Sequence, residues 1–532
     1  MPQTPIYNDL RAGFFVSLIA LPLCLGIAMA SGFPPMSGLI TAIIGGLLVS
    51  RVSGTQLTIN GPAAGLIVVV LDSVHTLGAG NTAAGVAYTL AAIVLSGLIQ
   101  IALGALRAGK LSAFFPSSVV HGMLAAIGII ILVKQIYVLL GVPAEAGSIV
   151  QQAMAIPKAI INMNVPIAMI GLVGLAVMIF WPRLPFKFSR SLPAPLWVLI
   201  SGLLFAYYFD LDHVHLYHSV VTQFFTQSEF LIGPAFLLNL PSNPMDALYL
   251  PDFALIGTAK FWFSVFNITL IGSLETLLSA AAVDKLDPKH RCSNLNRDLM
   301  AIGMGNTICG LVGGLPMIAE IVRSSSNISY GAQSGWANFF HSVFLLLFIS
   351  LGAGLIQQIP LASLAALLVY TGFRLASPME FAKTLSIGFG HFLVFIVTLI
   401  SILLTDLLLG VLIGIISELA LHGLRGLKPA QIFQAAYRIE ELEPGDFHVQ
   451  VHGAAVFSNF LALKSMTGTL PRGRQVIFDL SEVHLIDSTV LEFIYHFRSE
   501  YRREGGRCEI VGLHKHHAAA KHPLSVRRGI KL

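Results

Sequence analysis

A carboxylate and a guanidinium stand three residues apart in an apolar stretch, GLPMIAEIVRSSSNISYG, at residues 314–331. They are Glu320 and Arg323, and ionisable side chains at membrane depth are costly and mark functional sites by default. Another apolar stretch, GSLETLLSAAAV, contains Glu275, and Ser279 follows one helical turn later on the same face. Two carboxylates and one guanidinium leave one surplus negative charge, which a proton or Na⁺ would offset.

The composition places the chain in a membrane. It has 532 residues, of which 55% are hydrophobic and 11% are charged, and a mean hydropathy of +0.78. A soluble protein carries about 25% charged residues. The net charge of +5 does not indicate nucleic-acid binding, because the basic residues lie in short loops and no stacking platform or phosphate-binding motif is present. The four cysteines are scattered, so neither a disulfide framework nor a zinc site is expected.

The apolar segments predict about fourteen membrane spans, of which some are short enough to be broken within the bilayer. We expect the spans near residues 12–31, 36–50, 57–76, 84–106, 117–141, 160–181, 194–209, 258–284, 298–313, 315–331, 337–357, 359–374, 385–405 and 406–423. Residues 228–256 contain four prolines and predict an extracellular loop with a short interfacial helix.

The basic residues occur almost only in alternate loops. These loops contain Arg51; Arg107 and Lys110; Arg183, Lys187 and Arg190; Lys285, Lys289, Arg291 and Arg297; and Arg374 and Lys383. Because cytoplasmic loops carry the excess of Lys and Arg, the pattern predicts an even number of spans with both termini in the cytoplasm.

The third and tenth spans are interrupted at their starts. TINGPAAGLIVVV carries Gly61 and Pro62, and GGLPMIAEIVRSSSN carries Gly313, Gly314 and Pro316. These spans hold corresponding positions in two halves of seven, which predicts an inverted-repeat transporter with its site between them. Two opposed half-helix N-termini present free N–H groups and positive dipole ends, which suit an anion.

The composition changes after about residue 430. The segments FHVQVHGAAVFSNFLALKSM and RQVIFDLSEVHLIDSTVLEFIYHFRSEYRREGGRCEIVGL predict strand, helix, strand, helix and strand, which is a small soluble α/β domain. We therefore expect a transporter domain at residues 1–428 and a cytoplasmic domain at 429–532. The His-rich tail HKHHAAAKHPLSVRRGIKL is predicted to be frayed and solvated rather than a metal site.

Five motifs, in this order, resemble those of the SulP-type inorganic anion permeases, the family of prestin and pendrin. They are PLCLGIAMASGFPPMSGLI at 22–40, NGPAAG at 60–65, GSLETLLSAAAVDKLDPKHRCSNLNRDLMAIGMGN at 272–306, GGLPMIAEIVRSSSN at 313–327, and IFDLSEVHLIDSTVLEF at 477–493, which resembles the core of a STAS domain. The resemblance covers nearly the whole chain.

This resemblance implies an α-helical membrane protein with fourteen spans in two seven-span inverted repeats, divided into core and gate domains and followed by a cytoplasmic α/β STAS domain. Spans 1, 3, 8 and 10 would form the site. The resemblance also implies exchange or symport of bicarbonate, sulfate, chloride, oxalate or dicarboxylates, a homodimer and an elevator-like movement. We expect no enzyme activity and no resident cofactor. Na⁺ is a candidate coupling ion, and a cytosolic protein is a candidate partner of the STAS domain.

The resemblance also suggests individual site residues. Asn60 stands where the family usually has Ser or Thr, Glu275 matches a carboxylate linked in some members to coupling-ion binding, and Arg323 matches an Arg found in many members. We expect the coupling ion at Glu275, Ser279 and Glu320. The anion is expected against backbone N–H groups of 61–64 and 320–323, in a site formed by Asn60, Gly61, Ala63, Ala64, Ile321, Val322, Arg323 and Ser324.

Besides Asn60, the chain departs from the family pattern at four positions. Glu320 and Val322 stand where many members have Ser or another small polar residue. Leu23 and Ile27 stand where many eukaryotic members have Gln and Tyr. Recognition by side-chain hydroxyls is therefore weakened, and the substrate cannot be copied from a better-known relative.

Two site assignments keep an alternative. Glu320 and Arg323 could form a purely structural ion pair, since i,i+3 pairs are common on helices. Ser488 follows Asp487 at the start of a predicted helix. It is either part of an ordinary N-cap or a regulatory phosphorylation site, as in the bacterial anti-sigma antagonists that resemble this domain.

The leading functional prediction is secondary active transport of a small inorganic anion, with bicarbonate preferred and sulfate second, coupled to Na⁺ or H⁺ across a bacterial-type plasma membrane. A nucleobase/H⁺ symporter is the main alternative, because such proteins also carry carboxylates on the eighth and tenth spans. A dicarboxylate transporter and a membrane-anchored signalling scaffold are further alternatives.

Overall fold

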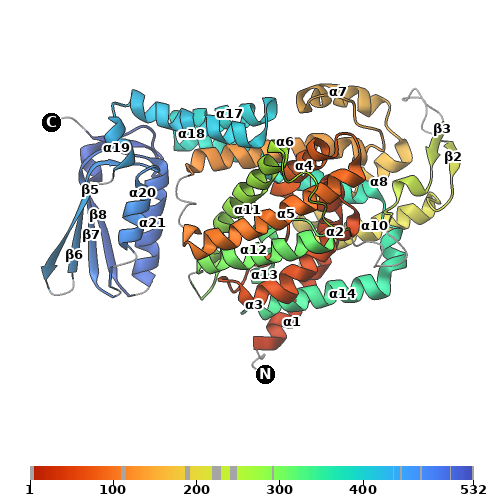
Figure 1. The fold of residues 1–532 in the computed structure, drawn as a ribbon, viewed down its shortest axis with the longest axis horizontal. Coiled ribbons are helices and arrows are strands. Elements are labelled where there is room, and N and C mark those ends of the chain that lie inside the picture. Colours follow the sequence, from red (N-terminus) through yellow and green to blue (C-terminus); the bar gives the residue numbers. More distant parts are fainter. Residues whose placement is uncertain are drawn as a thin grey trace. The chain divides into compact units, whose positions relative to one another are not determined.

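The protein divides into two compact units in the computed structural model, one made of residues 1–109 and 127–374 and the other of 110–126 and 375–532. The structure describes residues 5–109, 115–185, 192–218, 229–239, 249–289, 291, 293–434, 436–443, 446–467, 470–471, 473–503 and 505–529. Figure 1 shows that the first unit consists mainly of helices, with the small hairpin of β2 (His215–His218) and β3 (Glu229–Ile232) among them, whereas the second combines helices with a larger sheet. The predicted boundary at 428/429 lies inside the second unit, because the last two long apolar helices group with the C-terminal sheet domain.

Every predicted span contains a helix. The helices are α1 (Pro5–Ala30), α2 (Pro35–Ile44), α4 (Ile67–Gly78), α5 (Thr82–Ala105), α6 (Ser117–Leu139), α8 (Val165–Phe180), α10 (Ala194–Tyr208), α11 (Ala259–Leu286), α12 (Leu295–Val312), α13 (Ile321–Ser329), α14 (Trp336–Gln357), α15 (Leu361–Leu375), α17 (Phe389–Leu404) and α18 (Leu407–Leu424). Within the described residues, nine helical segments are long and apolar enough to cross a membrane. α2 continues through a π-helical turn, Gly45–Val49, into α3 (Ser50–Val52).

The connections contain elements that hydropathy did not predict. Helices α7 (Ile149–Ile161) and α16 (Pro378–Ile387) lie almost wholly outside the predicted spans, and strands β2 (His215–His218) and β3 (Glu229–Ile232) pair as an antiparallel hairpin. The predicted interfacial helix within 228–256 is reduced, in the described residues, to a 3₁₀ turn at Pro234–Phe236, while residues 240–248 lie outside the described chain.

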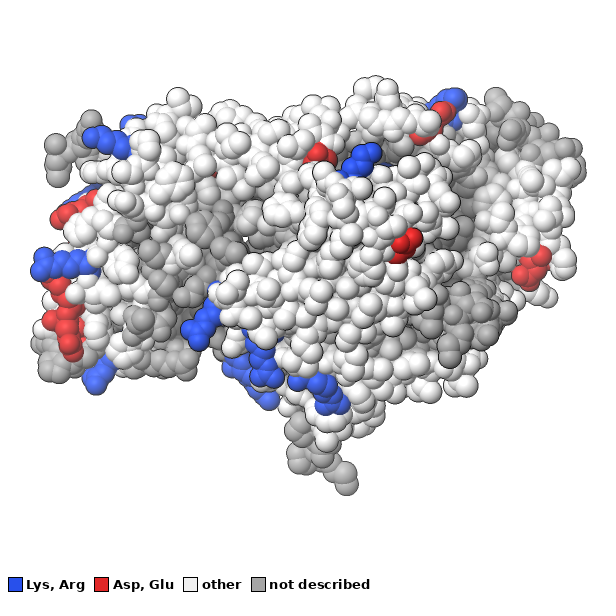
Figure 2. All heavy atoms as spheres, viewed as in Figure 1, with Lys and Arg blue, Asp and Glu red and all other residues white. Residues whose placement is uncertain are grey.

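The visible face of the helical unit is largely uncharged, as Figure 2 shows, which suits contact with lipid. Lys and Arg side chains gather at the edge where α3 lies. Arg51 of α3 places its guanidinium 3.7 Å from the centroid of Trp336 and 4.3 Å from that of Phe339. Such cation–π contacts are typical of an interfacial anchor. Three of the predicted loop cations, Lys110, Lys187 and Arg190, lie outside the described residues.

Glycines allow α5 and α12 to pack with their backbones in contact. A Cβ added at Gly97 would lie 2.5 Å from the backbone nitrogen of Thr307, and one added at Gly303 would lie 2.6 Å from the carbonyl oxygen of Gly97. Small residues at such crossings are the usual means by which membrane helices approach closely. This closely packed pair of helices supports the site described below through Gln100 on α5 and Asn306 on α12.

We expect Gly97→Ala to destabilise the helical unit by about 1–3 kcal/mol, because the added methyl group would overlap the backbone of α12 and force the helices apart. The matched control is Gly352→Ala in α14, where an added Cβ would meet nothing within 4 Å. That variant should be neutral or slightly stabilised, since Ala is the better helix former. Melting temperatures of both variants in detergent test the prediction, and equal melting temperatures would contradict it.

The two broken spans have the predicted construction. β1 (Ile59–Pro62) precedes a 3₁₀ turn, Ala64–Leu66, and then α4; β4 (Met317–Glu320) leads directly into α13. β1 and β4 pair antiparallel, with Ile59 opposite Glu320 and Pro62 opposite Met317. The extended backbone of each broken span therefore pairs with that of the other, which confirms that spans 3 and 10 are short half-helices that meet within the fold.

Buried polar side chains hold this ribbon in place. Asn306 of α12 accepts a hydrogen bond from the Met317 N–H at 2.6 Å and donates to the Met317 carbonyl at 3.3 Å. Thr41 of α2 donates to the Leu315 carbonyl at 2.9 Å, and Asn327 of α13 donates to the Leu57 carbonyl at 3.0 Å. These bonds satisfy backbone groups that the short strands leave unpaired, as a buried non-helical backbone requires.

The C-terminal part of the second unit is an α/β domain with a six-stranded sheet. Its elements are α19 (Pro429–Phe433), β5 (Ala436–Glu443), β6 (Asp446–Ala455), α20 (Phe460–Thr467), β7 (Gln475–Ile486), α21 (Ser488–Arg503), β8 (Arg507–Val511), β9 (His516–Ala518) and β10 (Arg527–Gly529). The sheet runs β5-β6-β7-β10-β9, with β8 paired to β7, and β6, β7 and β8 are parallel. The predicted order of strand, helix, strand, helix and strand matches β6, α20, β7, α21 and β8.

The prediction for the His-rich tail was wrong. Instead of a frayed terminus, β9 and β10 pair with each other, and β10 pairs with β7. His516 is buried, and its two ring nitrogens lie 3.0 Å and 2.7 Å from the carbonyl oxygens of Gly512 and Val483. Strands of three residues are too short to show an alternating pattern, and their charged side chains suggested solvation instead.

Candidate functional site

Glu320 ends β4 and forms the N-cap of α13. One of its carboxylate oxygens, Oε2, accepts a hydrogen bond from the Arg323 backbone N–H at 2.7 Å. The same oxygen lies 3.4 Å from Arg323 Nε, so the two side chains also form an ion pair. The ion pair that the sequence left open as an alternative is therefore present, and it stabilises the first turn of the half-helix.

Arg323 is completely buried, and its guanidinium joins three segments of the chain. Besides Glu320, it donates to the Pro62 carbonyl on β1 and to Cys24 Sγ on α1, the latter at 3.3 Å. A Cβ added at Gly61 would lie 2.7 Å from Arg323 Nη1, so the absence of a side chain at Gly61 makes room for the guanidinium. The charge thus lies behind the β1 backbone, close to the start of α4.

Glu275 lies in α11 and reaches the start of the other half-helix. Its side chain is buried, and within the described chain its Oε1 has no hydrogen-bond partner. A Cβ added at Gly65 would lie 1.6 Å from this oxygen, so Gly65 leaves the space that the carboxyl group fills. Glu275 and Glu320 are near enough for their charges to interact. A buried, unpaired carboxyl oxygen is costly unless a proton or a cation joins it.

The remaining predicted anion-site residues surround the two half-helix starts. Ser324 is buried; its Oγ accepts from the Ile59 N–H at 2.9 Å and donates to the Glu320 carbonyl at 2.5 Å. Asn60 is buried with both amide atoms unpaired among the described residues. The other site residues are more accessible: Ile321 is 41% exposed, and Val322 and Ala64 are partly buried.

The structure therefore brings together the predicted residues of spans 3, 8 and 10. Gly61 and Ala63 are buried in the β1 segment, and Ser279 is partly buried one turn beyond Glu275 on α11. Sequence reasoning missed the supporting residues Gln100, Asn306 and Gly65. Gln100 links α5 to the site by accepting from Asn306 at 2.7 Å and donating to Ser273 at 3.2 Å. Polar residues in the middle of predicted spans were the signal that could have found the first two.

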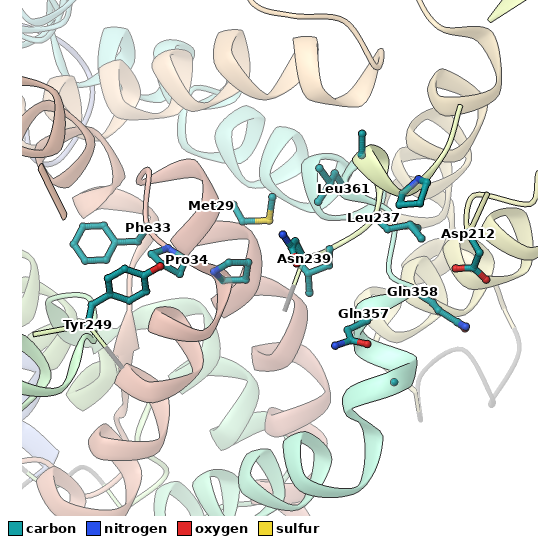
Figure 3. A pocket seen from close by; sticks show the side chains of 15 residues that line it. Met29, Phe33, Pro34, Asp212, Leu237, Asn239, Tyr249, Gln357, Gln358 and Leu361 are labelled. Atoms are coloured by element: carbon teal, nitrogen blue, oxygen red, sulfur yellow. The ribbon is translucent and has the colours of Figure 1, made fainter. Parts of the chain in front are cut away.

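A separate cavity of about 1320 Å³ lies between the α1–α2 connection, the segment 234–239 and the junction of α14 with α15 (Figure 3). Its lining includes Met29 and Phe33 from the connection, Asn239 and Gln357, and neither of the two glutamates. Figure 3 shows these side chains around the hollow. The cavity is lined by both apolar and polar side chains, and the glutamate carboxylates of the candidate site lie outside it.

Ser488, the predicted regulatory residue, is the first residue of α21, but Asp487 provides the cap. Asp487 accepts from the Val490 N–H at 2.8 Å and from the Phe457 N–H at 2.6 Å, and burial raises its pKa to about 6. The Ser488 hydroxyl is buried, 2.9 Å from His391 Nδ1 on α17 in the same unit. Phosphorylation of Ser488 stays a prediction, and a kinase would require this contact to open first.

Two opposed half-helices with ionisable groups buried where they meet define a secondary transporter, here joined to an α/β domain. The chain belongs to the sulfate permease family, whose model matches residues 6–424, and a STAS domain model matches residues 441–522. It is thus a multi-pass anion transporter of that family and not an enzyme, which confirms the family predicted from the five motifs.

The sequence similarity to known relatives extends over most of the chain. The putative sulfate transporter YvdB of Bacillus subtilis is 24% identical over 513 residues, covering 95% of this chain and 91% of the relative. The bicarbonate transporter BicA of Synechocystis is 24% identical over 524 residues, covering 95% and 88%. The solved transmembrane domain of a cyanobacterial BicA matches with a TM-score of 0.61 and 25% identity, covering 79% of this chain and 98% of that one.

Proposed function

We propose that the protein is an ion-coupled secondary transporter of a small inorganic anion, with bicarbonate as the preferred substrate and sulfate as the second. The observation that carries the proposal is the buried Glu275 carboxyl group at the start of α4, near the Glu320–Arg323 pair, of which one oxygen has no partner among the residues that the structure describes. Helix N-termini and a guanidinium attract an anion, while a carboxyl group at the same place calls for a compensating cation.

The coupling ion is either H⁺ or Na⁺. A proton on Glu275 would remove its charge directly. The donor set also suits Na⁺, because Glu275 Oε1 and the Ser279 hydroxyl one turn away are oxygen ligands of the kind that hard cations prefer. In both cases a cation at Glu275 would lower the electrostatic cost of binding the substrate anion close to Glu320.

The proposed movement and assembly rest on the family resemblance, and the proposed orientation rests on the loop charges. We propose an elevator-like movement in which the part carrying spans 1, 3, 8 and 10 slides against the rest, in a homodimer in a bacterial-type plasma membrane. The bias of Lys and Arg toward alternate loops supports cytoplasmic termini. The STAS domain is then cytoplasmic, and a cytosolic protein is its proposed partner.

Uptake of radiolabelled bicarbonate and sulfate into proteoliposomes, with Na⁺ and pH gradients imposed separately, tests the proposal. We expect one of the two gradients to drive accumulation of one of the anions above the level in protein-free vesicles. Absence of gradient-driven uptake of both anions would contradict the assignment. Chloride, oxalate and a dicarboxylate as competitors establish the range of substrates.

A nucleobase/H⁺ symporter is the second candidate, because Glu275 and Glu320 place carboxyl groups on both the eighth and tenth spans. Membership of the sulfate permease family and the buried Arg323 favour the anion. Competition by uracil or a purine in the same vesicles separates the two: inhibition by a nucleobase without inhibition by an anion would favour the symporter.

A further inference from the structure

Both half-helix N-termini already have a carboxyl group of the chain beside them. At α13, Glu320 Oε2 accepts the Arg323 N–H at 2.7 Å, so one of the first-turn donors that an anion would use is already occupied. At α4, Glu275 Oε1 lies against Gly65 in the turn that begins the helix. A substrate anion that binds the Arg323 N–H competes with Glu320 for it, because one N–H group cannot serve two carboxylate-like acceptors at full strength.

The two glutamates differ in how easily they can move. Glu275 is buried against Gly65 in the turn before α4, whereas Glu320 is only partly buried, with 15% of its side chain exposed, and is followed by Ile321, which is 41% exposed. Glu320 is also an unusual choice for a purely structural cap, since Ser, Thr, Asp and Asn are the side chains that N-caps favour. Its longer side chain can swing from the helix terminus toward the open side.

Three neighbours set the electrostatic surroundings of Glu320, and two of them are ionisable. The two charged groups are Arg323 on its own helix and Glu275 on α11, and the third neighbour, the uncharged Cys24 thiol on α1, accepts a hydrogen bond from the guanidinium. While Glu320 occupies the helix terminus, it neutralises Arg323. If the terminus held no anion at all, a completely buried guanidinium would lack its compensating charge, which is costly in a low-dielectric interior.

We propose that Glu320 is a tethered anion, which fills the α13 N-terminus when no substrate is bound and gives way to the transported anion when it arrives. This inference rests on the proposed function. It assigns Glu320 two effects: it competes with the substrate, which weakens apparent affinity, and it stands in for the substrate while the empty carrier returns. Net uptake requires that return, whereas exchange of one anion for another does not.

Three variants separate charge from capping. Glu320→Ser keeps a favoured N-cap but removes the charge, Glu320→Gln keeps the length and one acceptor oxygen, and Glu320→Asp keeps both the charge and a favoured cap. Each is reconstituted in vesicles loaded either with the same anion, to measure exchange, or with gluconate, to measure net uptake. Radiolabelled bicarbonate and sulfate are the probes, and melting temperature reports on folding.

We expect the Ser and Gln variants to retain exchange with an apparent KM about 10-fold lower, the size of one charge-assisted contact, and to lose net uptake about 10-fold relative to exchange. The Asp variant should keep the wild-type ratio of net uptake to exchange. A merely structural cap predicts otherwise: Ser would behave like wild type, or both transport modes would fall together at unchanged KM. Either result would overturn the proposal.

The control is the wild-type protein in the same vesicles. If the wild type shows no exchange and no net uptake of either probe, the proposed function fails. If the wild type transports but the Ser and Gln variants keep its KM and its ratio of net uptake to exchange, only the role of Glu320 fails. The two failures are therefore distinct.

Discussion

Replacement of Glu275 by Gln is expected to reduce gradient-driven uptake to the level of protein-free vesicles. The amide keeps the shape of the carboxyl group in the space beside Gly65, but it cannot gain or lose charge with a proton or Na⁺. Coupling requires a group whose charge depends on the driving ion, and within the described site only Glu275 has a buried carboxyl oxygen without a partner. The measurement is anion accumulation with imposed Na⁺ and pH gradients.

The control for this variant is Thr276→Val on the same helix. Thr276 is buried, and its hydroxyl also lacks a partner among the described residues, so the isosteric change perturbs α11 without touching the site carboxyl groups. We expect Thr276→Val to transport normally and both variants to express and melt like the wild type. Unchanged ion dependence in Glu275→Gln would exclude Glu275 as the coupling group and would leave Glu320 as the candidate.

The membrane fold was largely predictable because its signals are local. Runs of apolar residues gave the fourteen helical segments, and Gly61-Pro62 and Gly313-Gly314 identified the two places where the helix must break. What the sequence could not show is which side chain fills which space. Gly65 and Glu275 are far apart in the chain, and no local pattern indicates that the absence of a Cβ at one makes room for the carboxyl group of the other.

The same limit explains the partial prediction of the candidate site. The i,i+3 spacing predicted contact between Glu320 and Arg323, but it could not reveal that Glu320 caps α13 through the Arg323 N–H. Nor could it show that the guanidinium donates to Pro62 on the opposite strand. Those bonds depend on the pairing of β1 with β4, which joins segments more than 250 residues apart. Hydrogen bonds between distant segments therefore hold the site together in a way that its sequence motifs do not reveal.

Arg323→Ala is expected to weaken both the fold and anion binding. The substitution removes a completely buried side chain that contacts Glu320, Pro62 and Cys24, and breaking a buried ion pair costs about 3–5 kcal/mol. It also removes the positive charge behind the β1 backbone, which should lower anion affinity by about 10- to 150-fold, or about 1.5–3 kcal/mol. Arg323→Lys should recover part of the affinity, because it keeps the charge but not the forked donor geometry.

A double-mutant cycle with Glu320→Gln and Arg323→Met separates these two effects. The double variant replaces the pair with uncharged side chains of similar length, so no unpaired charge remains buried, and we expect much of the lost melting temperature to return. Anion affinity should nevertheless stay low, because the helix N-termini remain but the guanidinium is gone. If affinity returned together with stability, the pair would be structural only, and the half-helix termini alone would hold the anion.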